Sequence, residues 1–321
     1  MVNDGLAFFH CRSISLLYAL MRIALATCSE LPSCEVDDVP LHHALVKLGV
    51  EVLQPCWDDP AFDWAGVDAC LIRTTWDYHL HRDEFVAWAQ RVERLTALFN
   101  PAALVLWNTN KLYLRDLAEC GVAVIDTLWL DRGASVDLGA LLDARGWQRG
   151  FFKPVVGATA YRTCRFENHG DSLTAAQVLL DSFLVTEAMQ FQPYLNSVET
   201  HGEESMFFID GAYSHSVRKI PALGDYRVQD DFGASDQVHL HTSAEIEQAA
   251  VVLRLVEQNP AWVGEAHRGS LLYARVDWLR DAAGALRLCE FEAVEPCLFF
   301  RHAPQAAQRL AQALLRRVSG K

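Results

Sequence analysis

Near the C-terminus, two apolar segments carry acidic side chains at alternate positions, and this pattern restricts the fold of the chain more than any other feature. Segments 271–278 and 286–292 are separated by an Asp-Ala-Ala-Gly turn, which predicts a β-hairpin. Because side chains alternate between the two faces of a strand, one face of this hairpin gathers a guanidinium and three carboxylates. These side chains are Arg275, Asp277, Glu290 and Glu292.

Carboxylates that share one face repel one another unless a cation lies between them. Oxygen ligands without a neighbouring cluster of His or Cys suit Mg²⁺, which usually binds together with the phosphate groups of a substrate. Asp277, Glu290 and Glu292 are therefore candidate magnesium ligands. The alternative is a pair of edge strands whose acidic side chains are solvated.

Composition restricts the class of protein and of partner. The chain has 321 residues, 51% of them hydrophobic, and a formal net charge of −13, which is typical of a globular protein. The negative charge argues against nucleic acid or an anionic membrane as the main partner. Nine scattered cysteines without a C-x-x-C spacing indicate reduced thiols in a cytoplasmic protein.

The first 20 residues are predicted to lie outside the native fold. Residues 14–20 are apolar, but no small-residue cleavage site of a secretion signal follows them cleanly. The segment that begins at Met21 predicts the first strand of an α/β domain. We therefore expect Met21 to be the native start and residues 1–20 to be a non-native or disordered extension.

Alternating strand and helix patterns predict an N-terminal α/β substrate domain, 21–105, with a parallel sheet. The expected strands are 23–26, 51–53 and 69–72, and the expected helices are 41–48 and 84–98. Ligands of such sheets bind beyond the C-terminal ends of the strands. Arg73, Thr75 and Asp77 lie there and are candidate substrate-binding residues; the alternative is a capped turn with an aromatic anchor.

Two further units are expected, a central one at 106–194 and a C-terminal one at 195–321. The central unit has a predicted helix at 111–119 and strands at 122–125 and 150–156. The C-terminal unit has two strands, a polar loop, a helix, the acidic hairpin and a closing helix. Their predicted ranges are 205–209, 214–219, 224–236, 244–258, 271–292 and 303–318.

Lysines inside apolar strands also suggest an anionic ligand. A charge there is costly unless it is compensated, and Lys153 and Lys219 both lie in such runs. Each alone could be a snorkelling or ion-paired lysine. Together with Lys111, Arg227 and Arg275 and the late acidic residues, they form a set that a triphosphate with magnesium would explain.

The histidines give a weaker signal. His239 and His241 stand two positions apart, as metal ligands on one strand face could. A zinc site needs further ligands, and the neighbouring sequence offers none. A metal site at these histidines is therefore not favoured by the sequence.

In order, spacing and residue type, the lysines and late acids resemble those of the ATP-grasp superfamily, over about residues 22–318. Segments 71–78, 107–108 and 290–296 are similar to the glutathione-synthetase-like branch, which includes the cyclo-ligase of D-cycloserine biosynthesis. The segments that carry the resemblance are Asn110-Lys111, Phe152-Lys153-Pro154, Phe191-Gln192-Pro193-Tyr194-Leu195, Gly202-Glu203-Glu204-Ser205, Tyr213-Ser214-His215-Ser216-Val217-Arg218-Lys219, Gly224-Asp225-Tyr226-Arg227-Val228-Gln229, Arg275-Val276-Asp277 and Glu290-Phe291-Glu292-Ala293-Val294-Glu295-Pro296.

This resemblance implies an ATP-grasp fold, α/β and α+β, behind an N-terminal parallel-sheet domain, with the central unit as a lid and its loop at 157–162 as the mobile part. It implies that Asp277, Glu290 and Glu292 bind magnesium, where many relatives have Asn in place of Glu292. Residues implied to face the reacting phosphoryl group are Arg275, Lys219 and Arg227, and Glu295 joins the substrate site. Residues implied to bind ATP are Lys111, Lys153, Gly157, Gln192, Tyr194, Leu195, Glu199 and Glu203.

The implied activity is ATP-dependent and magnesium-dependent ligation of a carboxylate to an amine on a small amino-acid-like substrate, through an acylphosphate. Two magnesium ions are expected, and a homodimer is compatible with the resemblance. One alternative is a cyclo-ligase that closes a ring within an amino-acid derivative similar to O-ureidoserine. Another is a nucleotide-binding or phosphotransferase protein without ligase activity.

Overall fold

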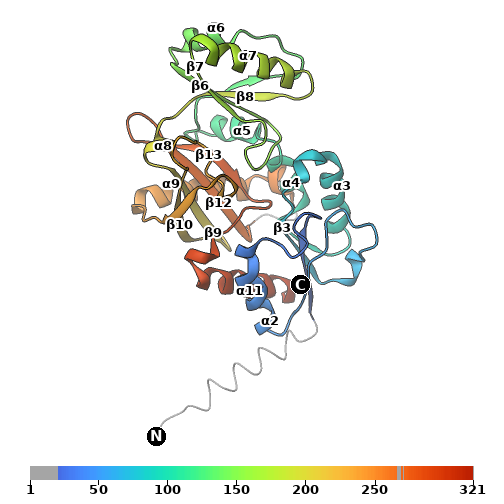
Figure 1. Cartoon of the computed structure of the whole chain (residues 1–321). Coiled ribbons are helices and arrows are strands. Elements are labelled where there is room, and N and C mark those ends of the chain that lie inside the picture. Colours follow the sequence, from blue (N-terminus) through green and yellow to red (C-terminus); the bar gives the residue numbers. More distant parts are fainter. Residues whose placement is uncertain (1–20, 266–268, 270, 321) are drawn as a thin grey trace.

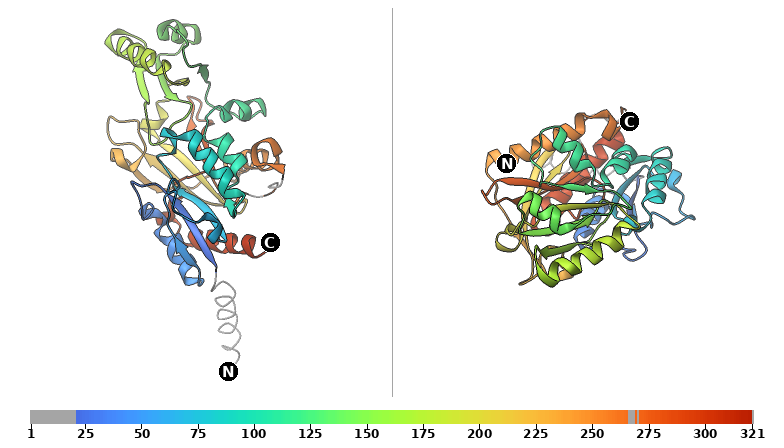
Figure 2. Two further views of the ribbon diagram at one scale, coloured as in Figure 1. Left: turned by 90° about the vertical axis from the view of Figure 1, so that its right-hand side faces the viewer. Right: turned by 90° about the horizontal axis from the view of Figure 1, so that it is seen from above.

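The structure is a computed structural model that describes residues 21–265, 269 and 271–320. The predicted extension at 1–20 lies outside the described residues. Three β-sheets organise the chain (Figure 1). The central unit stands at one end of the molecule, as a second view also shows (Figure 2).

The N-terminal sheet is parallel, as predicted, with the strand order β2-β1-β3-β4. Helices α2 (Val39–Lys47) and α3 (Arg82–Glu93) connect its strands. The predicted helix at 84–98 is wrong in its last turn, because the helix ends at Glu93 and residues 97–99 add an edge strand. The strands are β1 (Arg22–Thr27), β2 (Glu51–Leu53), β3 (Ala69–Thr74) and β4 (Ala97–Phe99).

The central sheet is antiparallel, with the order β5-β8-β6-β7. Helices α6 (Leu138–Arg145) and α7 (Gly170–Leu184) pack against it and share its apolar core. The predicted strand at 122–125 is wrong, since only Val124 pairs there, in an isolated bridge with Leu288. The strands are β5 (Leu128–Leu130), β6 (Arg149–Pro154), β7 (Cys164–Glu167) and β8 (Met189–Pro193).

The C-terminal sheet is antiparallel, with the order β11-β10-β9-β12-β13. It contains the predicted hairpin, in which Asp277 lies opposite Glu290 and Arg275 opposite Glu292. Its strands are β9 (Glu203–Ile209), β10 (Ala212–Ile220), β11 (Ser235–Val238), β12 (Tyr273–Arg280) and β13 (Leu286–Glu292). Its helices are α8 (Ser197–Thr200), α9 (Ser243–Gln258), α10 (Pro260–Val263) and α11 (Pro304–Ser319).

Two helices before the central sheet belong to the core of the C-terminal sheet. Leu104 of α4 (Ala102–Asn108) and Leu117 of α5 (Tyr113–Glu119) pack in the same cluster as Phe208 and Trp278. The predicted helix at 111–119 is therefore present from Tyr113. Its packing places it with the C-terminal unit, although it lies within the expected central unit.

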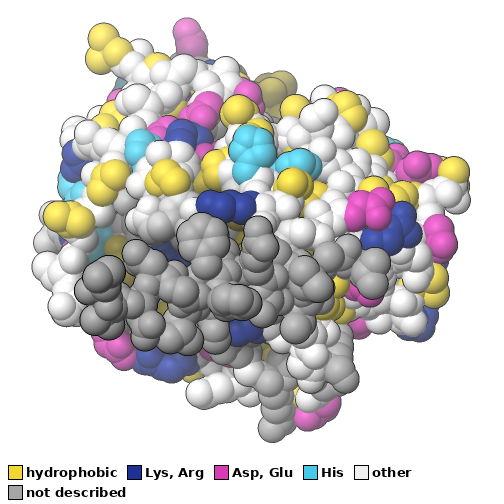
Figure 3. Space-filling model, turned by 90° about the horizontal axis from the view of Figure 1, so that it is seen from below, with side chains coloured by type: hydrophobic (Ala, Val, Ile, Leu, Met, Phe, Trp, Pro, Cys, Tyr) yellow, Lys and Arg dark blue, Asp and Glu magenta, His cyan; other side chains and the backbone are white. Residues whose placement is uncertain are grey.

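The N-terminal and C-terminal sheets share a second apolar cluster. Leu25 of β1 and Leu45 of α2 pack with Phe207 of β9 and Leu314 of α11. On the face seen from below, the described apolar, basic, acidic and histidine side chains are interspersed (Figure 3). Within the described residues, no helix has the length and apolarity that crossing a membrane requires.

Candidate active site

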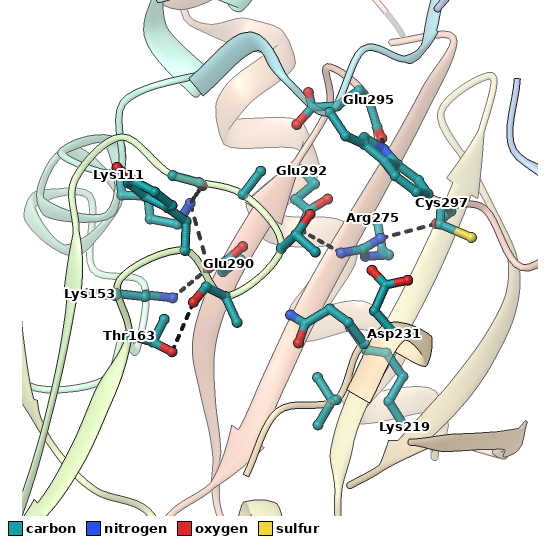
Figure 4. Close-up of a pocket in the computed structure, with 18 of the residues that line it drawn as sticks. Lys111, Lys153, Thr163, Lys219, Asp231, Arg275, Glu290, Glu292, Glu295 and Cys297 are labelled. Atoms are coloured by element: carbon teal, nitrogen blue, oxygen red, sulfur yellow. Dashed lines mark hydrogen bonds and ion pairs between the residues drawn. The ribbon is translucent and has the colours of Figure 1, made fainter. Parts of the chain in front are cut away.

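A cavity of about 210 Å³ lies where the central sheet, the acidic hairpin and the N-terminal domain meet. Lys111 and Lys153 reach it from one side, and Arg275 and Glu292 from the other, with Glu290 between them (Figure 4). Carboxylates and cations that are far apart in the sequence therefore line the same cavity.

Glu290 connects the central sheet to the hairpin. Its carboxylate accepts a hydrogen bond from Lys153 Nζ at 2.5 Å and lies 3.8 Å from Lys111 Nζ. Burial would raise the pKa of Glu290, but the two lysines outweigh burial and lower it. Burial would likewise lower the pKa of Lys153, whereas Glu290 raises it. Both groups are therefore charged at neutral pH.

Asp277 is held by cations behind Glu290. Arg275 Nε donates to both of its oxygens at 3.0 Å, and Lys219 Nζ lies 3.8 Å away. Arg275 also donates to Glu292 at 2.5 Å, while Lys219 pairs with Glu203. Burial would raise the pKa of Asp277, but Arg275 and Lys219 lower it.

Buried side chains of α4 and α5 fix the hairpin strand that carries the acids. Asn108 Nδ2 donates to Phe291 O at 2.7 Å, and its Oδ1 accepts from Ala293 N at 2.8 Å. Tyr113 Oη accepts from Phe291 N at 3.0 Å. Because β13 alternates, fixing Phe291 also fixes the directions of Glu290 and Glu292.

The acids exceed the cations that neutralise them, and this excess fits a bound metal ion. Burial and the neighbouring Asp277 and Glu290 raise the pKa of Glu292 to about 8, although Arg275 opposes the shift. Burial also raises the pKa of Glu295 to about 7. A divalent cation among these oxygens would remove the repulsion.

A buried amide of the central sheet lies next to Lys153 but does not line the cavity. Gln190 lies opposite Lys153 in the pairing of β8 with β6 and is 0% exposed. Its Nε2 has no hydrogen-bond partner among the described residues. An unpartnered buried donor of this kind is costly.

Several residues proposed from sequence line the cavity or contact residues that do. Asp277 and Glu203 lie behind the wall, paired with Arg275 and Lys219. Those in the wall are Lys111, Lys153, Gly157, Lys219, Arg275, Glu290, Glu292 and Glu295.

The three proposed substrate residues of the N-terminal domain do not line the cavity. Arg73 is only 2% exposed and forms an ion pair with Asp38 at 2.8 Å. Thr75 is buried, and Asp77 accepts a hydrogen bond from Trp57 Nε1 at 2.9 Å. Strand β3 extends to Thr74, two residues beyond its predicted end, so Arg73 remains inside the sheet.

The residues proposed to bind adenine and ribose lie outside the cavity wall. Gln192 Nε2 donates to Thr127 Oγ1 at 2.9 Å, while Tyr194 donates to Glu199. Leu195 lines a different, more open depression. Arg227, proposed to face the phosphoryl group, pairs with Asp225 at 2.7 Å.

Sequence reasoning missed many of the residues that line the wall. Among them, Trp76 and Tyr78 come from the segment 73–78 that was singled out, but at its even-numbered positions. Three missed charged side chains, Glu35, Asp231 and Arg301, come from segments without a strand pattern. The observed end of β3 would have been needed to choose between the odd-numbered and even-numbered positions.

Sequence comparison identifies the family. Residues 23–100 match a family described as D-cycloserine synthetase DcsG, N-terminal domain. Over 314 residues the chain is 31% identical to the cycloserine biosynthesis protein DcsG of Streptomyces lavendulae, covering 92% of this chain and 98% of that protein. The chain belongs to the ATP-grasp superfamily and is related to DcsG.

Solved structures agree with this ATP-grasp assignment. The crystal structure of D-cycloserine synthetase DcsG matches with a TM-score of 0.80 and 30% identity, over 92% of this chain and 99% of that one. D-alanine–D-alanine ligase from Bacillus anthracis, complexed with ATP, shares the fold with a TM-score of 0.63 and 14% identity, over 93% and 97%. The ATP-grasp ligase PsnB, complexed with a minimal precursor, Mg and ADP, gives 0.58 and 16%, over 92% and 98%.

The predicted superfamily and fold are thus confirmed. This ATP-grasp enzyme is a ligase that forms carbon–nitrogen bonds. ATP-grasp homologues bind ATP and magnesium, which agrees with the lysines and acids that converge in the cavity.

Proposed function

We propose that this DcsG-related ligase joins a carboxylate to an amine of a small amino-acid-like substrate through an acylphosphate. The observation that carries the proposal is the convergence of Lys153 and Lys111 on Glu290, beside Glu292 and Arg275. Such a set binds polyphosphate and metal on one side and a carboxylate on the other. It contains no activated nucleophile, and this chemistry requires none.

The reaction would proceed in two steps. A carboxylate oxygen of the substrate attacks the γ-phosphorus of ATP, the bond to the bridging oxygen breaks, and ADP leaves. The amine then attacks the acyl carbon, phosphate leaves, and the nitrogen loses a proton. Both steps depend on alignment and on neutralising negative charge.

Each cation of the cavity has a role in this scheme. Lys111 and Lys153 would bind the phosphates of ATP, and Arg275 with Lys219 would stabilise the charge on the transferring group. Arg275 already forms ion pairs with Asp277 and Glu292. On its other side is the end of the cavity that Glu295 and Cys297 line (Figure 4).

Glu290, Glu292 and Asp277 would hold the magnesium, and we propose two ions. When bound, magnesium would neutralise phosphate charge and orient the γ-phosphate. Both oxygens of Asp277 are already bonded to Arg275, and one also accepts from Ser205 at 2.6 Å. Glu290 and Glu292 are consequently the more available ligands.

The adenine would lie at the C-terminal end of β8, near residues 192–195, with Glu199 or Glu203 toward the ribose. Glu203 is paired with Lys219 and Glu199 with Arg165. Either carboxylate must exchange its cation for a ribose hydroxyl. We retain Arg227 as a candidate for the phosphoryl group, to be reached by movement of its loop.

A second candidate function is ring closure within one amino-acid derivative. The relationship to DcsG, which is named a D-cycloserine synthetase, spans nearly the whole of both chains. The chemistry would be the same, except that the carboxylate and the amine belong to one molecule.

Release of ADP and phosphate, followed by product mass, tests the proposal. The enzyme is incubated with ATP, magnesium and pooled amino acids and carboxylic acids, beside a Glu290→Gln control. Release that requires both an acid and an amine identifies ligation, and release with one substrate alone identifies ring closure. A stable phosphorylated product without an amide would contradict both. Light scattering on a sizing column tests whether the chain forms the homodimer that the resemblance allows.

A further inference from the structure

The face of the C-terminal sheet opposite the cavity carries a separate polar cluster. In β9, Glu203 lies opposite Lys219 and points toward the active site, so Glu204 must point to the other face. Glu204 is 0% exposed and sits opposite Arg218 and Trp278 in the pairing of the strands. This face is the one packed by α9, beside α8 and β12 (Figure 1).

Three imidazoles converge on the Glu204 carboxylate. His201 follows α8, and His239 and His241 follow β11. Their Nε2 atoms lie 2.6, 3.4 and 2.7 Å from the Glu204 oxygens, in that order. The donor atoms of His201, Glu204 and His239 all lie within 4.8 Å of one another.

We propose that His201, His239, His241 and Glu204 form a binding site for a divalent transition-metal ion such as Zn²⁺, distinct from the ATP site. Imidazole nitrogens with one carboxylate oxygen are the donors that such ions prefer, whereas Mg²⁺ and Ca²⁺ prefer sites built from oxygens. The sequence offered His239 and His241 without further ligands. The fold supplies them from α8 and β9.

His241 provides a second observation. Its side chain is 0% exposed, and its Nδ1 is buried without a hydrogen-bond partner among the described residues. A buried imidazole nitrogen without a partner is costly. His241 lies outside the set of mutually close donor atoms, and it would join the site as a fourth ligand through Nε2, which faces Glu204 at 2.7 Å.

Two arginines set the selectivity of the site. Arg280 donates to both Glu204 oxygens, at 2.6 and 2.9 Å, and to Glu245 at 2.8 Å. Arg218 of β10 lies opposite Glu204 in the strand pairing. Because these guanidinium groups offset the negative charge of Glu204 and Glu245, the affinity for a metal ion must come mainly from the imidazoles. The site should therefore reject hard cations and take Zn²⁺ or Co²⁺.

Cobalt titration of the metal-stripped full chain tests the site. Excess magnesium without nucleotide occupies the active-site acids, and visible absorption reports Co²⁺ bound to nitrogen ligands. We expect one equivalent to bind, Zn²⁺ to displace it, and affinity to fall at acid pH as the imidazoles protonate. His239→Gln and His201→Gln should each weaken binding at least about tenfold.

The matched control is His42→Gln with His43→Gln, which alters an adjacent histidine pair on α2 and should leave the titration unchanged. Circular dichroism without metal establishes that each variant is folded. Absence of the cobalt spectrum in the wild type, or equal titration by the wild type and both single variants, would overturn the proposal. In that case the histidines only hydrogen-bond Glu204.

Discussion

At the scale of single residues, Glu290 combines a structural and a chemical role, and one substitution separates them. Glu290→Gln keeps the volume but removes the charge that faces Lys153 and Lys111. We expect kcat for ADP release to fall at least about 100-fold, since a charge that stabilises the reacting groups is lost. Stability should fall by less than about 3 kcal/mol, because both partners reach the open cavity.

The control is Glu51→Gln on β2, where the side chain is 59% exposed and pairs with Arg22. It should leave kcat within about twofold, because exposed ion pairs contribute little. Circular dichroism and thermal unfolding accompany the assay. Full activity in the Glu290 variant would remove this residue from the proposed metal site.

Glu292 predicts a pH dependence of stability in the absence of magnesium. Its pKa is raised from 4.5 to about 8 by burial and by the acids nearby. A carboxyl group with a raised pKa binds more protons in the folded state, so its contribution is complete below 4.5 and is lost as the pH rises to about 8. The unfolding free energy of the wild type, minus that of Glu292→Gln, should decrease across this range.

Urea unfolding of both proteins at pH 5 and pH 8 measures this difference. Other groups contribute equally to the unfolding free energies of the two proteins, so their contributions cancel in the difference. One such group is His215, whose pKa is lowered to about 4 by burial and which favours folding at higher pH. Magnesium should reduce the decrease, since it favours the ionised carboxylate. If the difference in unfolding free energy rises with pH, the attraction of Arg275 for the ionised carboxylate outweighs burial and the neighbouring acids in setting the pKa of Glu292.

The sequence could predict a site residue where the alternation of side chains along a strand was enough to decide which face of the sheet that residue occupies. Glu290 and Glu292 were predicted because a hairpin with a short turn fixes both faces. The ion pair of Arg73 was not predicted, because its partner, Asp38, lies 35 positions away in a 3-10 turn. No local sequence pattern predicts an ion pair between residues so far apart.

At the scale of secondary structure elements, Gly150 of β6 shows how tightly the central sheet is packed. A Cβ there would lie 2.4 Å from Phe166 Cζ and 2.8 Å from Phe191 Cε2. Both rings belong to the buried core of the central sheet. Gly150→Ala should therefore cost about 1–3 kcal/mol through overpacking, measured by thermal or chemical unfolding.

Gly139→Ala in α6 is the matched control within the same unit. Its added Cβ would lie 3.3 Å from Asp137 Oδ1 and from Leu173 Cδ2, which are side-chain atoms that can shift, and alanine favours the helix by up to about 1 kcal/mol. This variant should therefore lose less stability than Gly150→Ala. Equal destabilisation by the two substitutions would mean that the core of the central sheet can repack around Gly150.

The two longest helices were predicted well, whereas some short strands were not, although the three-residue strand β2 has its predicted range, 51–53. Helices α9 and α11 lie within one residue of their predicted ranges, because many turns repeat the same apolar face. Strands β4 and β5 have three residues each, too few for alternation to distinguish a strand from the end of a helix or a loop. Their pairing partners, distant in the sequence, decide their conformation.

At the scale of the whole molecule, the distribution of apolar cores indicates which parts move together. The N-terminal and C-terminal sheets share a core through α2 and α11. The buried core cluster of the central sheet, by contrast, consists only of residues between Leu130 and Phe191. Phe151 of β6 also packs in a small cluster with Val228 and Leu279 of the C-terminal unit. We therefore propose that the central sheet moves as a unit by breaking this small cluster and not the shared core.

In this structure the Lys153–Glu290 ion pair joins that movable unit to the hairpin, at the position where phosphate and magnesium would bind. Lys153→Met keeps a long apolar side chain but removes the pair. Without nucleotide, amide exchange in residues 157–163, the loop that covers the cavity, should become at least about fivefold faster, equal to about 1 kcal/mol.

The control is Lys47→Met on the exposed end of α2, which should leave amide exchange in this loop unchanged. ATP with magnesium should slow the exchange in the wild type. If Lys153→Met weakens ATP binding while loop exchange stays the same, the lysine binds nucleotide without holding the lid, and closure must depend on other contacts.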